Sequence, residues 1–365
     1  MNKHLRGNLW LFFLTLSVAC LFYPTVLWLF AHALFPTKAA GSLIQITGSD
    51  GKTVVIGSTL IAQPFTKEGY FQPRPSAASY NATASGGSNW GASNPKLRDR
   101  VARQLGPIVN YDDTADSSLK DRSVQKDMEA WFTSPPVGPN QDARVVQWAK
   151  SYPTLAAAWV KSDTNKPAII DWLTQHPVLL EDWHKVKPEA PMPDLADDKT
   201  IPFDDLALPF FVSFSAAYPQ RWPEVEEFET GAKDEQGQAV KSKRFKAVTE
   251  GADIQATFFD TWLQAHPGIA LKKVPADMVM ASGSGLDPHI TLRNANYQLD
   301  SVVSGRMKGT TRVAGAIRTQ VESIVQDHTF TPLSGLLGEP LVNVLEVNLE
   351  LDKQLPLAAD APKMP

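Results

Sequence analysis

The feature that most constrains this chain is an uncharged, apolar stretch near its start. From Leu9 to Phe35 the sequence contains no Asp, Glu, Lys or Arg and is dominated by Leu, Phe, Trp, Val and Ala. Such a stretch is long enough to cross about 30 Å of bilayer hydrocarbon as a tilted helix. Lys3 and Arg6 before it and Ala31-His32-Ala33 near its end would also suit a cleaved signal peptide. The apolar region of a signal peptide has only about 7 to 15 residues, so the length favours a retained transmembrane helix.

The flanking charges predict how this helix is oriented. Lys3 and Arg6 precede the span and only Lys38 follows soon after, so the positive-inside rule places residues 1–8 in the cytoplasm and residues 9–35 in the membrane, in contact with lipid. The rest of the chain is then extracytoplasmic. Pro24 interrupts the span and predicts a kink that a neighbouring helix could satisfy, which makes Pro24 a candidate contact with a partner.

Charge and cysteine content exclude several functions. The formal net charge of −4 provides no basic field to neutralise phosphates, so we expect no nucleic-acid partner. Cys20 is the only cysteine, so no disulfide can form within the chain. The seven histidines are scattered and no Cys or His cluster has metal-ligand spacing, so we expect no metal site.

Local patterns predict an α+β fold in which a mixed α/β extracytoplasmic domain follows the transmembrane helix. On the N-terminal side we expect a strand at Thr53–Ile56, a helix at Thr59–Phe65 capped by Ser58, an ordered loop from Tyr70 to Gly91 and a helix from Asn94-Pro95 to about Gln104. On the C-terminal side we expect a strand at Pro275–Ala281, a turn at Gly283–Gly285, a helix from Asp287-Pro288 to about Val303, a helix at Thr311–Gln326 and a strand at Leu345–Asp352.

Between about Gly106 and Ala270 the sequence becomes rich in Trp and Pro. The pattern Trp-x-x-x-Tyr/His-Pro occurs at Trp148–Pro153, Trp172–Pro177 and Trp262–Pro267. Because the residue before a proline is disfavoured in a helix, each copy indicates a helix that ends there. These features predict a mainly helical insert, and the charged residues from Gly231 to Lys246 predict a solvated loop within it.

Three short motifs resemble catalytic or nucleotide-binding sequences without completing them. Gly51-Lys52-Thr53 ends like a phosphate-binding loop, but Ile46 stands where the motif needs glycine. Asp198-Lys199-Thr200 begins like the phosphorylated loop of P-type pumps, but Ile201-Pro202 follows.

The third motif combines Ser284, Asp287 and His289, the residue types of a nucleophile relay. Their spacing within six residues disfavours such a relay and favours a capped helix start. A membrane-anchored hydrolase that uses Ser284 and His289 remains an alternative, but we expect no catalytic residue in this chain.

Several segments, taken in order behind one N-terminal span, resemble KdpC, the C subunit of the Kdp high-affinity potassium-transporting P-type ATPase. The segments are residues 57–65, 70–76, 84–89, 274–277, 281–290, 297–298, 337–340 and 342–345. The resemblance covers about residues 1–105 and 270–352. It therefore implies a KdpC-like domain in two parts, 36–105 and 271–352, separated by an insert at 106–270. The Pro- and Ala-rich composition of residues 353–365 predicts a disordered tail.

The resemblance implies an accessory subunit of an ATP-driven potassium uptake pump in the bacterial inner membrane. Its expected partners are a potassium-channel-like A subunit, an ATP-hydrolysing B subunit and a small F-type peptide subunit. The family role is that of a catalytic chaperone that raises the ATP affinity of the hydrolysing subunit. Because ATP is inside and this domain is expected outside, we expect ATP to act through the complex and the coupling to be indirect. The alternative is a membrane-anchored binding module whose Trp-rich insert captures a cell-surface ligand.

The matched segments also nominate residues for contacts with partner subunits. The Arg74 guanidinium suits docking on a partner's carboxylate or carbonyl groups, although an intrachain salt bridge fits equally well. Ser301 stands where the family's arginine is expected after Tyr297-Gln298, a departure that bears on one partner contact. The full set of candidates is Pro24, Ser58, Gln63, Arg74, Ser76, Ser85, Ser88, Asn89, Asp287, His289 and Gln298.

Overall fold

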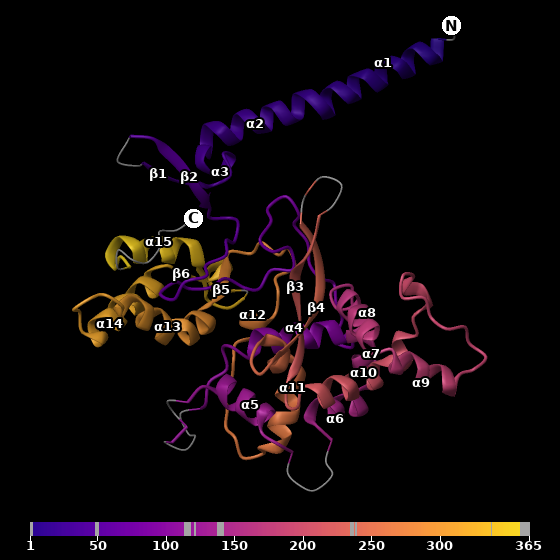
Figure 1. Cartoon of the computed structure of the whole chain (residues 1–365). Coiled ribbons are helices and arrows are strands. Elements are labelled where there is room, and N and C mark those ends of the chain that lie inside the picture. Colours follow the sequence, from indigo (N-terminus) through magenta and orange to yellow (C-terminus); the bar gives the residue numbers. More distant parts are fainter. Residues whose placement is uncertain are drawn as a thin grey trace. The chain divides into compact units, whose positions relative to one another are not determined.

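The chain forms two compact units, and both ends of the sequence belong to the same one (Figure 1). The computed structural model describes residues 3–47, 51–112, 118–119, 122–136, 142–233, 237, 239–336 and 338–357. Unit 1 comprises Met1–Asn89 and Pro275–Pro365, and unit 2 comprises Trp90–Val274. The predicted insert at 106–270 lies inside unit 2, but the domain boundaries 36–105, 106–270 and 271–352 stay predictions. Residues 358–365 of the predicted tail lie outside the described residues.

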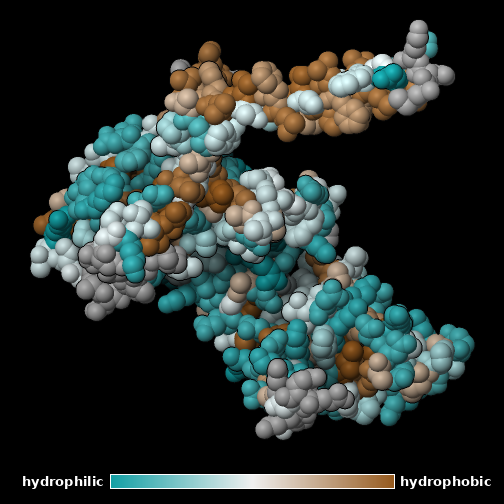
Figure 2. Space-filling model, turned by 90° about the horizontal axis from the view of Figure 1, so that it is seen from above, coloured by the Kyte–Doolittle hydropathy of each residue, from teal (hydrophilic) through white to brown (hydrophobic). Residues whose placement is uncertain are grey.

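Unit 1 begins with a long apolar helix. It consists of α1 (Lys3–Ser17), a π-helical turn η1 (Val18–Phe22) and α2 (Tyr23–Leu34), followed by the short α3 (Pro36–Ala39). His4–Leu34 is long and apolar enough to span a membrane, and none of its most apolar window is buried in the protein. Figure 2 shows the hydrophobic side chains along this helix. The π-helical turn lies just before Pro24, so the helix continues through the proline with a locally widened backbone.

The strands of unit 1 form two small antiparallel sheets. β1 (Leu43–Thr47) pairs with β2 (Thr53–Ser58), which includes the predicted strand, and a bulge lies between Ile44 and Gln45. The second sheet has the order β5 (His289–Thr291), β7 (Leu341–Asn343), β6 (Thr329–Phe330). Leu337, which belongs to one matched segment, lies outside the described residues.

Helices and an extended segment enclose the core of unit 1. The helical elements are α12 (Ala276–Val279), α13 (Leu292–Met307), α14 (Ala314–Asp327), η3 (Pro332–Gly335) and α15 (Val344–Gln354). Phe71 from the predicted loop is 1% exposed and belongs to the same buried cluster as Val302, Val321 and Val347. The predicted loop from Tyr70 to Gly91 is confirmed, because it contains no helix or strand.

Two of the predicted strands in unit 1 are wrong. Leu345–Asp352 alternates in sequence, yet it lies in α15, whose buried residues Val344, Val347, Asn348 and Leu351 have helical spacing. Asn343 starts this helix by accepting the backbone N–H groups of Leu345 and Glu346. The predicted strand at Pro275–Ala281 contains the helical turn α12 instead.

Two predicted helix starts are also wrong. Thr59–Phe65 is not helical; Ser58 Oγ accepts the Leu60 N–H in a turn after β2, as a cap would, but no helix follows. Asp287-Pro288 leads into β5, and the helix begins only at Leu292. Thr291 is the cap of that helix, because its hydroxyl accepts the Asn294 N–H. The predicted helix at Thr311–Gln326 is confirmed as α14, with a start three residues later.

Unit 2 is mainly helical and contains one hairpin. Its elements are α4 (Pro95–Leu105), α5 (Val124–Thr133), α6 (Arg144–Ser151), α7 (Pro153–Val160), α8 (Lys166–Gln175), α9 (Val178–Val186), η2 (Asp198–Thr200), α10 (Phe203–Ala217), β3 (Trp222–Lys233), β4 (Ala239–Val248) and α11 (Ala252–Ala265). Asn94 caps α4 as predicted.

The three Trp-x-x-x-Tyr/His-Pro copies all end a helix, as predicted. α6, α8 and α11 stop directly before Tyr152, His176 and His266, and these residues share φ near −130° and ψ near 60°. The tryptophan of the first copy, Trp148, stacks edge to face with Trp222 in an aromatic core.

The predicted charged loop at Gly231–Lys246 is wrong, because most of it belongs to the β3–β4 hairpin (Figure 1). The acidic and basic runs face each other across the strands: Glu226 opposes Arg244, Glu227 opposes Lys243 and Glu229 opposes Lys241. Opposite charges at such positions favour pairing. The sequence analysis treated each charge run alone and missed this complementarity.

Candidate functional site

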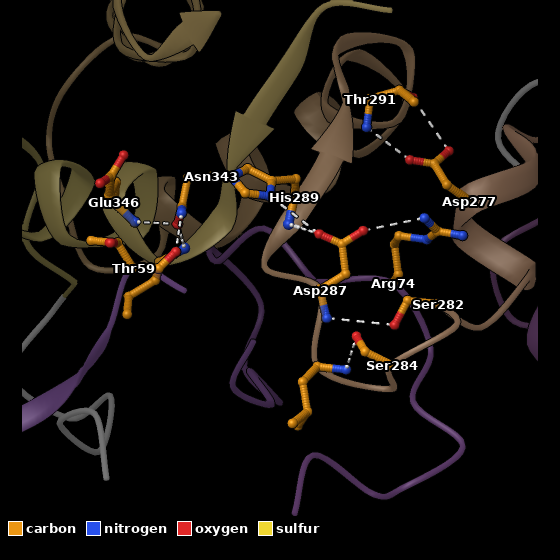
Figure 3. A network of polar contacts seen from close by, with 12 residues as sticks. Thr59, Arg74, Asp277, Ser282, Ser284, Asp287, His289, Thr291, Asn343 and Glu346 are labelled. Atoms are coloured by element: carbon orange, nitrogen blue, oxygen red, sulfur yellow. Dashed lines mark hydrogen bonds and ion pairs between the residues drawn. The ribbon is translucent and has the colours of Figure 1, made fainter. Parts of the chain in front are cut away.

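The predicted candidates Arg74, Asp287 and His289 meet at one carboxylate in unit 1. Arg74 Nη1 donates to Asp287 Oδ2 at 3.3 Å. Asp287 Oδ1 accepts the His289 backbone N–H at 3.0 Å and lies 3.2 Å from His289 Nδ1. Figure 3 shows the carboxylate between the guanidinium and the imidazole ring. The salt bridge considered from the sequence is therefore present.

The environment of Asp287 favours its ionised form. Burial of the carboxyl group raises its pKa, but hydrogen bonds from the His289 side chain and backbone and the charges of His289 and Arg74 outweigh burial and lower the pKa below 3.8. About one third of the Asp287 and Arg74 side chains stays exposed. The pair is thus accessible to solvent while it joins two distant parts of the sequence.

The glycine- and serine-rich segments on either side of this pair are bonded to each other. Ser76 Oγ donates to the Gly285 carbonyl at 2.6 Å and accepts the backbone N–H groups of Ala78 and Tyr80. Ser85 Oγ donates to the Ser284 carbonyl at 3.1 Å. Gly285 has φ of 69° and approaches so closely that a Cβ there would lie 2.9 Å from the Gly86 carbonyl oxygen.

Two buried amides hold the extended segment after Tyr70. Gln298 accepts the Gln72 N–H at 2.7 Å and donates to the Gln72 carbonyl at 3.0 Å. Asn348 makes the same pair of bonds to Phe71, both at 2.9 Å. The segment therefore receives from side chains the bonds that a neighbouring strand would supply. Gln298 was a predicted partner contact; Asn348 was missed because its sequence neighbourhood was interpreted as a strand.

Other candidates have local roles in the structure. Ser58 Oγ donates to the Gly41 carbonyl at 2.7 Å, and Gln63 Nε2 donates to the Ile56 carbonyl at 2.9 Å. Asn89 adopts a positive φ of 51°, and Ser88 adjoins it. Pro24 lies in the exposed apolar helix. Contacts of these residues with partner subunits remain predictions.

Two further residues that the sequence analysis did not select organise unit 1. Asp277 accepts the Thr291 N–H at 2.8 Å (Figure 3). It also accepts the Asn294 side-chain N–H at 3.0 Å. Arg306 is 3% exposed, bonds to the Gly69 carbonyl at 2.7 Å and pairs with Asp352 at 2.8 Å. Arg306 lies three residues beyond the predicted helix end at about Val303, and its partner Gly69 is distant in the sequence, so no local pattern identified it.

The structure offers no support for a nucleophile relay. Ser284 Oγ accepts the Leu286 N–H at 3.1 Å, and His289 Nδ1 faces Asp287. Figure 3 shows Ser284 and His289 on opposite sides of Asp287. Within the described ranges no group of three His, Cys, Asp or Glu residues could hold a metal ion.

Comparison with known proteins places these features in a family. The family model described as "KdpC: K+-transporting ATPase, c chain" matches residues 5–130 and 223–353, more than half of the chain. The chain belongs to the KdpC family. The residues between the two matched ranges, 131–222, lie within unit 2.

Several curated KdpC-family proteins are similar to this chain. The potassium-transporting ATPase KdpC subunit of Pectobacterium atrosepticum is 49% identical over 105 residues, which cover 28% of this chain and 52% of that protein. The corresponding subunit of Xanthomonas oryzae pv. oryzae is 36% identical over 165 residues, 45% of this chain and 77% of that protein. That of Methanosphaerula palustris is 45% identical over 109 residues, 30% of this chain and 56% of that protein. The chain thus spans about half the length of the first of these relatives.

Proposed function

We propose that this chain is the accessory and assembly subunit of a high-affinity, ATP-driven potassium uptake pump. The main support for this proposal is that the KdpC-like segments from both parts of the sequence pack together in unit 1. Ser76 and Ser85 from the first part bond directly to Gly285 and Ser284 from the second. An exposed apolar helix of membrane-spanning length belongs to the same unit.

The proposed partners are the potassium-channel-like A subunit, the ATP-hydrolysing B subunit and the small F-type peptide subunit. The helix would span the inner membrane in contact with lipid, with the N-terminus in the cytoplasm, because Lys3 and Arg6 precede it and Lys38 follows it. Unit 1 and unit 2 would then face outward.

We also propose that the chain raises the ATP affinity of the B subunit without touching ATP. An extracytoplasmic domain cannot reach a cytoplasmic nucleotide, so the effect must pass through the helices of the partners as a coupling free energy. A pump purified without this chain should therefore need more ATP for half-maximal hydrolysis than the intact pump.

Arg74 is the candidate we favour for direct contact with a partner. Its Nη1 bonds to Asp287, and nearly one third of its side chain stays exposed. A guanidinium has five N–H donors, so Arg74 keeps donors that a carboxylate or carbonyl group of another subunit could accept. Arg74→Gln should weaken copurification of the partners, whereas Arg293→Gln, which removes an exposed arginine paired with Glu339, should not.

Growth at limiting potassium tests the proposed function. A bacterial strain that lacks only this chain should fail to grow at micromolar potassium and should recover when the chain is restored. Equal growth with and without the chain would contradict the proposal. Millimolar potassium, at which high-affinity uptake is dispensable, is the control.

Ligand binding by unit 2 is a second candidate function, favoured by a cavity of about 110 Å³. Trp131, Trp148 and Tyr152 line it together with Arg144 and the neutral polar side chain of Gln264. Aromatic surfaces with a few polar groups are typical of small-molecule sites. Normal potassium uptake after deletion of unit 2 would favour this function, whereas loss of uptake would assign unit 2 to the pump.

A further inference from the structure

A cavity lined by three basic side chains lies in unit 1, away from the Arg74–Asp287 pair in the sequence. Its volume is about 170 Å³, and Arg306, Lys308, Gly309, Thr310 and Arg312 contribute to its lining, together with the apolar Ile317. A water molecule takes about 30 Å³ in the liquid, so a small tetrahedral ion fits this space. No Asp or Glu is among the described residues that line it. The basic side chains of Arg306, Lys308 and Arg312 therefore line one opening.

Arg306 forms the buried part of this cavity. Its Nε bonds to the Gly69 carbonyl and its Nη1 bonds to Asp352 and to the Leu355 carbonyl, the latter at 2.7 Å. Its Nη2 is buried and has no partner among the described residues. A buried donor without an acceptor is unfavourable. An oxyanion in the cavity would lie in the field of this guanidinium.

The turn after α13 brings the other two cations to the same opening. Gly309 has φ of 75°, a left-handed conformation that glycine adopts without strain, and it reverses the chain between Lys308 and Arg312. Lys308 is paired with Glu68. The Arg312 guanidinium has no ion pair among the described residues and donates one long bond of 3.5 Å, to Gln320 Oε1. Its charge is therefore available to a ligand.

We propose that this cavity binds a phosphate-type oxyanion, with Arg312 and Lys308 as its direct ligands and the buried Arg306 as the fixed charge beneath it. Guanidinium groups match the geometry of phosphate oxygens, and a partly buried site protects the interaction from screening by salt. The ligand can be free inorganic phosphate or the phosphodiester of a lipid headgroup, because both offer the same oxygens.

Titration of the full chain in uncharged detergent tests this site. Inorganic phosphate and the soluble headgroup phosphodiester glycerophosphoglycerol are titrated separately by calorimetry, against chloride at equal ionic strength. Tighter binding of phosphate identifies the free ion, and tighter binding of the phosphodiester identifies a lipid headgroup. The double variant Lys308→Gln/Arg312→Gln should bind the preferred anion at least about tenfold more weakly, because it loses two charge-assisted contacts.

Two control variants separate a site from general charge. Arg293→Gln and Lys353→Gln each remove an exposed cation of unit 1 that does not line the cavity, and their double variant should bind like the wild type. The proposal would be overturned if neither phosphate nor the phosphodiester bound more tightly than chloride, or if both double variants lost anion affinity equally. Because these titrations use the chain alone, their failure would leave its proposed role in the pump standing.

Discussion

Asp287 joins two distant segments of unit 1 through one carboxylate. Arg74 reaches it from the first part of the KdpC-like sequence, and His289 lies two residues after it in the second. About one third of the side chain is exposed, so solvent screens the pair partly and its contribution to stability is modest. Arg74, Asp287 and His289 were selected from the sequence as candidate partner contacts. The interaction found lies within the chain, and their contact with a partner stays a prediction.

Replacing Asp287 by Asn should therefore lower the free energy of unfolding of unit 1 by about 1 kcal/mol at neutral pH. The pKa of Asp287 is lowered in the folded chain, so its stabilisation is present above the ordinary value of 3.8 and is lost as the pH falls through the lowered folded value. Urea unfolding at pH 7 and pH 3 should show the difference between variant and wild type shrinking at the lower pH.

The matched control for this variant is Asp300→Asn, which removes the exposed surface partner of Arg318. Such surface pairs contribute little, so the control should unfold almost like the wild type at both pH values. Equal destabilisation by the two variants would contradict the role assigned to Asp287.

Two helical glycines provide a second test at the scale of single residues. A Cβ at Gly305 of α13 would collide with the Gly69 nitrogen and lie 2.6 Å from the Gly69 Cα, whereas a Cβ at Gly315 of α14 would meet nothing within 4 Å. Gly305→Ala should thus destabilise unit 1 by more than about 2 kcal/mol, because backbone must move. Gly315→Ala should stabilise it by about 0.5 to 1 kcal/mol.

Denaturant unfolding followed by circular dichroism measures both glycine variants on the same scale. A Gly305→Ala protein as stable as the wild type would show that α13 does not approach the segment at Gly69 as closely as described.

At the scale of elements, the extended segment after Tyr70 depends on α13 and α15. The Asn348 side chain is fully buried and satisfies both the N–H and the carbonyl group of Phe71. Asn348→Leu should destabilise unit 1 by about 2 to 4 kcal/mol, because it leaves two buried backbone groups without partners. Hydrogen exchange at the Phe71 amide should also be faster in the Asn348→Leu variant than in the wild type.

Gln354→Leu on the exposed side of the same helix is the control, since among the described residues the Gln354 side chain bonds to Glu350 and Gln320, away from Phe71. In the Gln354→Leu variant the Phe71 amide should exchange at the wild-type rate. Unchanged exchange in the Asn348 variant would show that other contacts hold the segment.

Sequence predicted elements well where the signal was local. The Asn94 cap, the proline after each Trp-x-x-x-Tyr/His copy and the apolar N-terminal helix lie within a few residues of what they predict. Prediction from sequence failed where contacts with residues far along the chain determine the secondary structure. The alternation at Leu345–Asp352 resembles a strand, but Asn343 starts a helix there and contacts with the core of unit 1 stabilise that helix. The β3–β4 hairpin pairs an acidic run with a basic run that lies farther along the chain.

The same division applies to the candidate site. Arg74, Asp287 and Gln298 could be selected because they lie in segments that resemble KdpC. The amide pairing of Asn348 and the buried Arg306 could not be selected by their local patterns alone, because their partners are 277 and 237 residues away.

At the scale of the whole molecule, the two units have separate cores and should unfold with separate transitions. Eight of the ten tryptophans lie in unit 2, and the other two, Trp10 and Trp28, lie in the apolar helix. Tryptophan fluorescence therefore reports chiefly on unit 2. Gly305→Ala should shift the calorimetric transition of unit 1 and leave the fluorescence transition in place; equal shifts of both would contradict independent units.

Copurification from the native host tests the central claim most directly. The tagged chain is isolated in detergent from cells starved of potassium, its partners are identified by mass spectrometry, and potassium-stimulated ATPase activity is measured. Recovery of a P-type ATPase and a channel-like membrane protein together with that activity is the predicted result. Recovery of this chain alone, without potassium-stimulated hydrolysis, would contradict its assignment as a pump subunit and favour the membrane-anchored binding module.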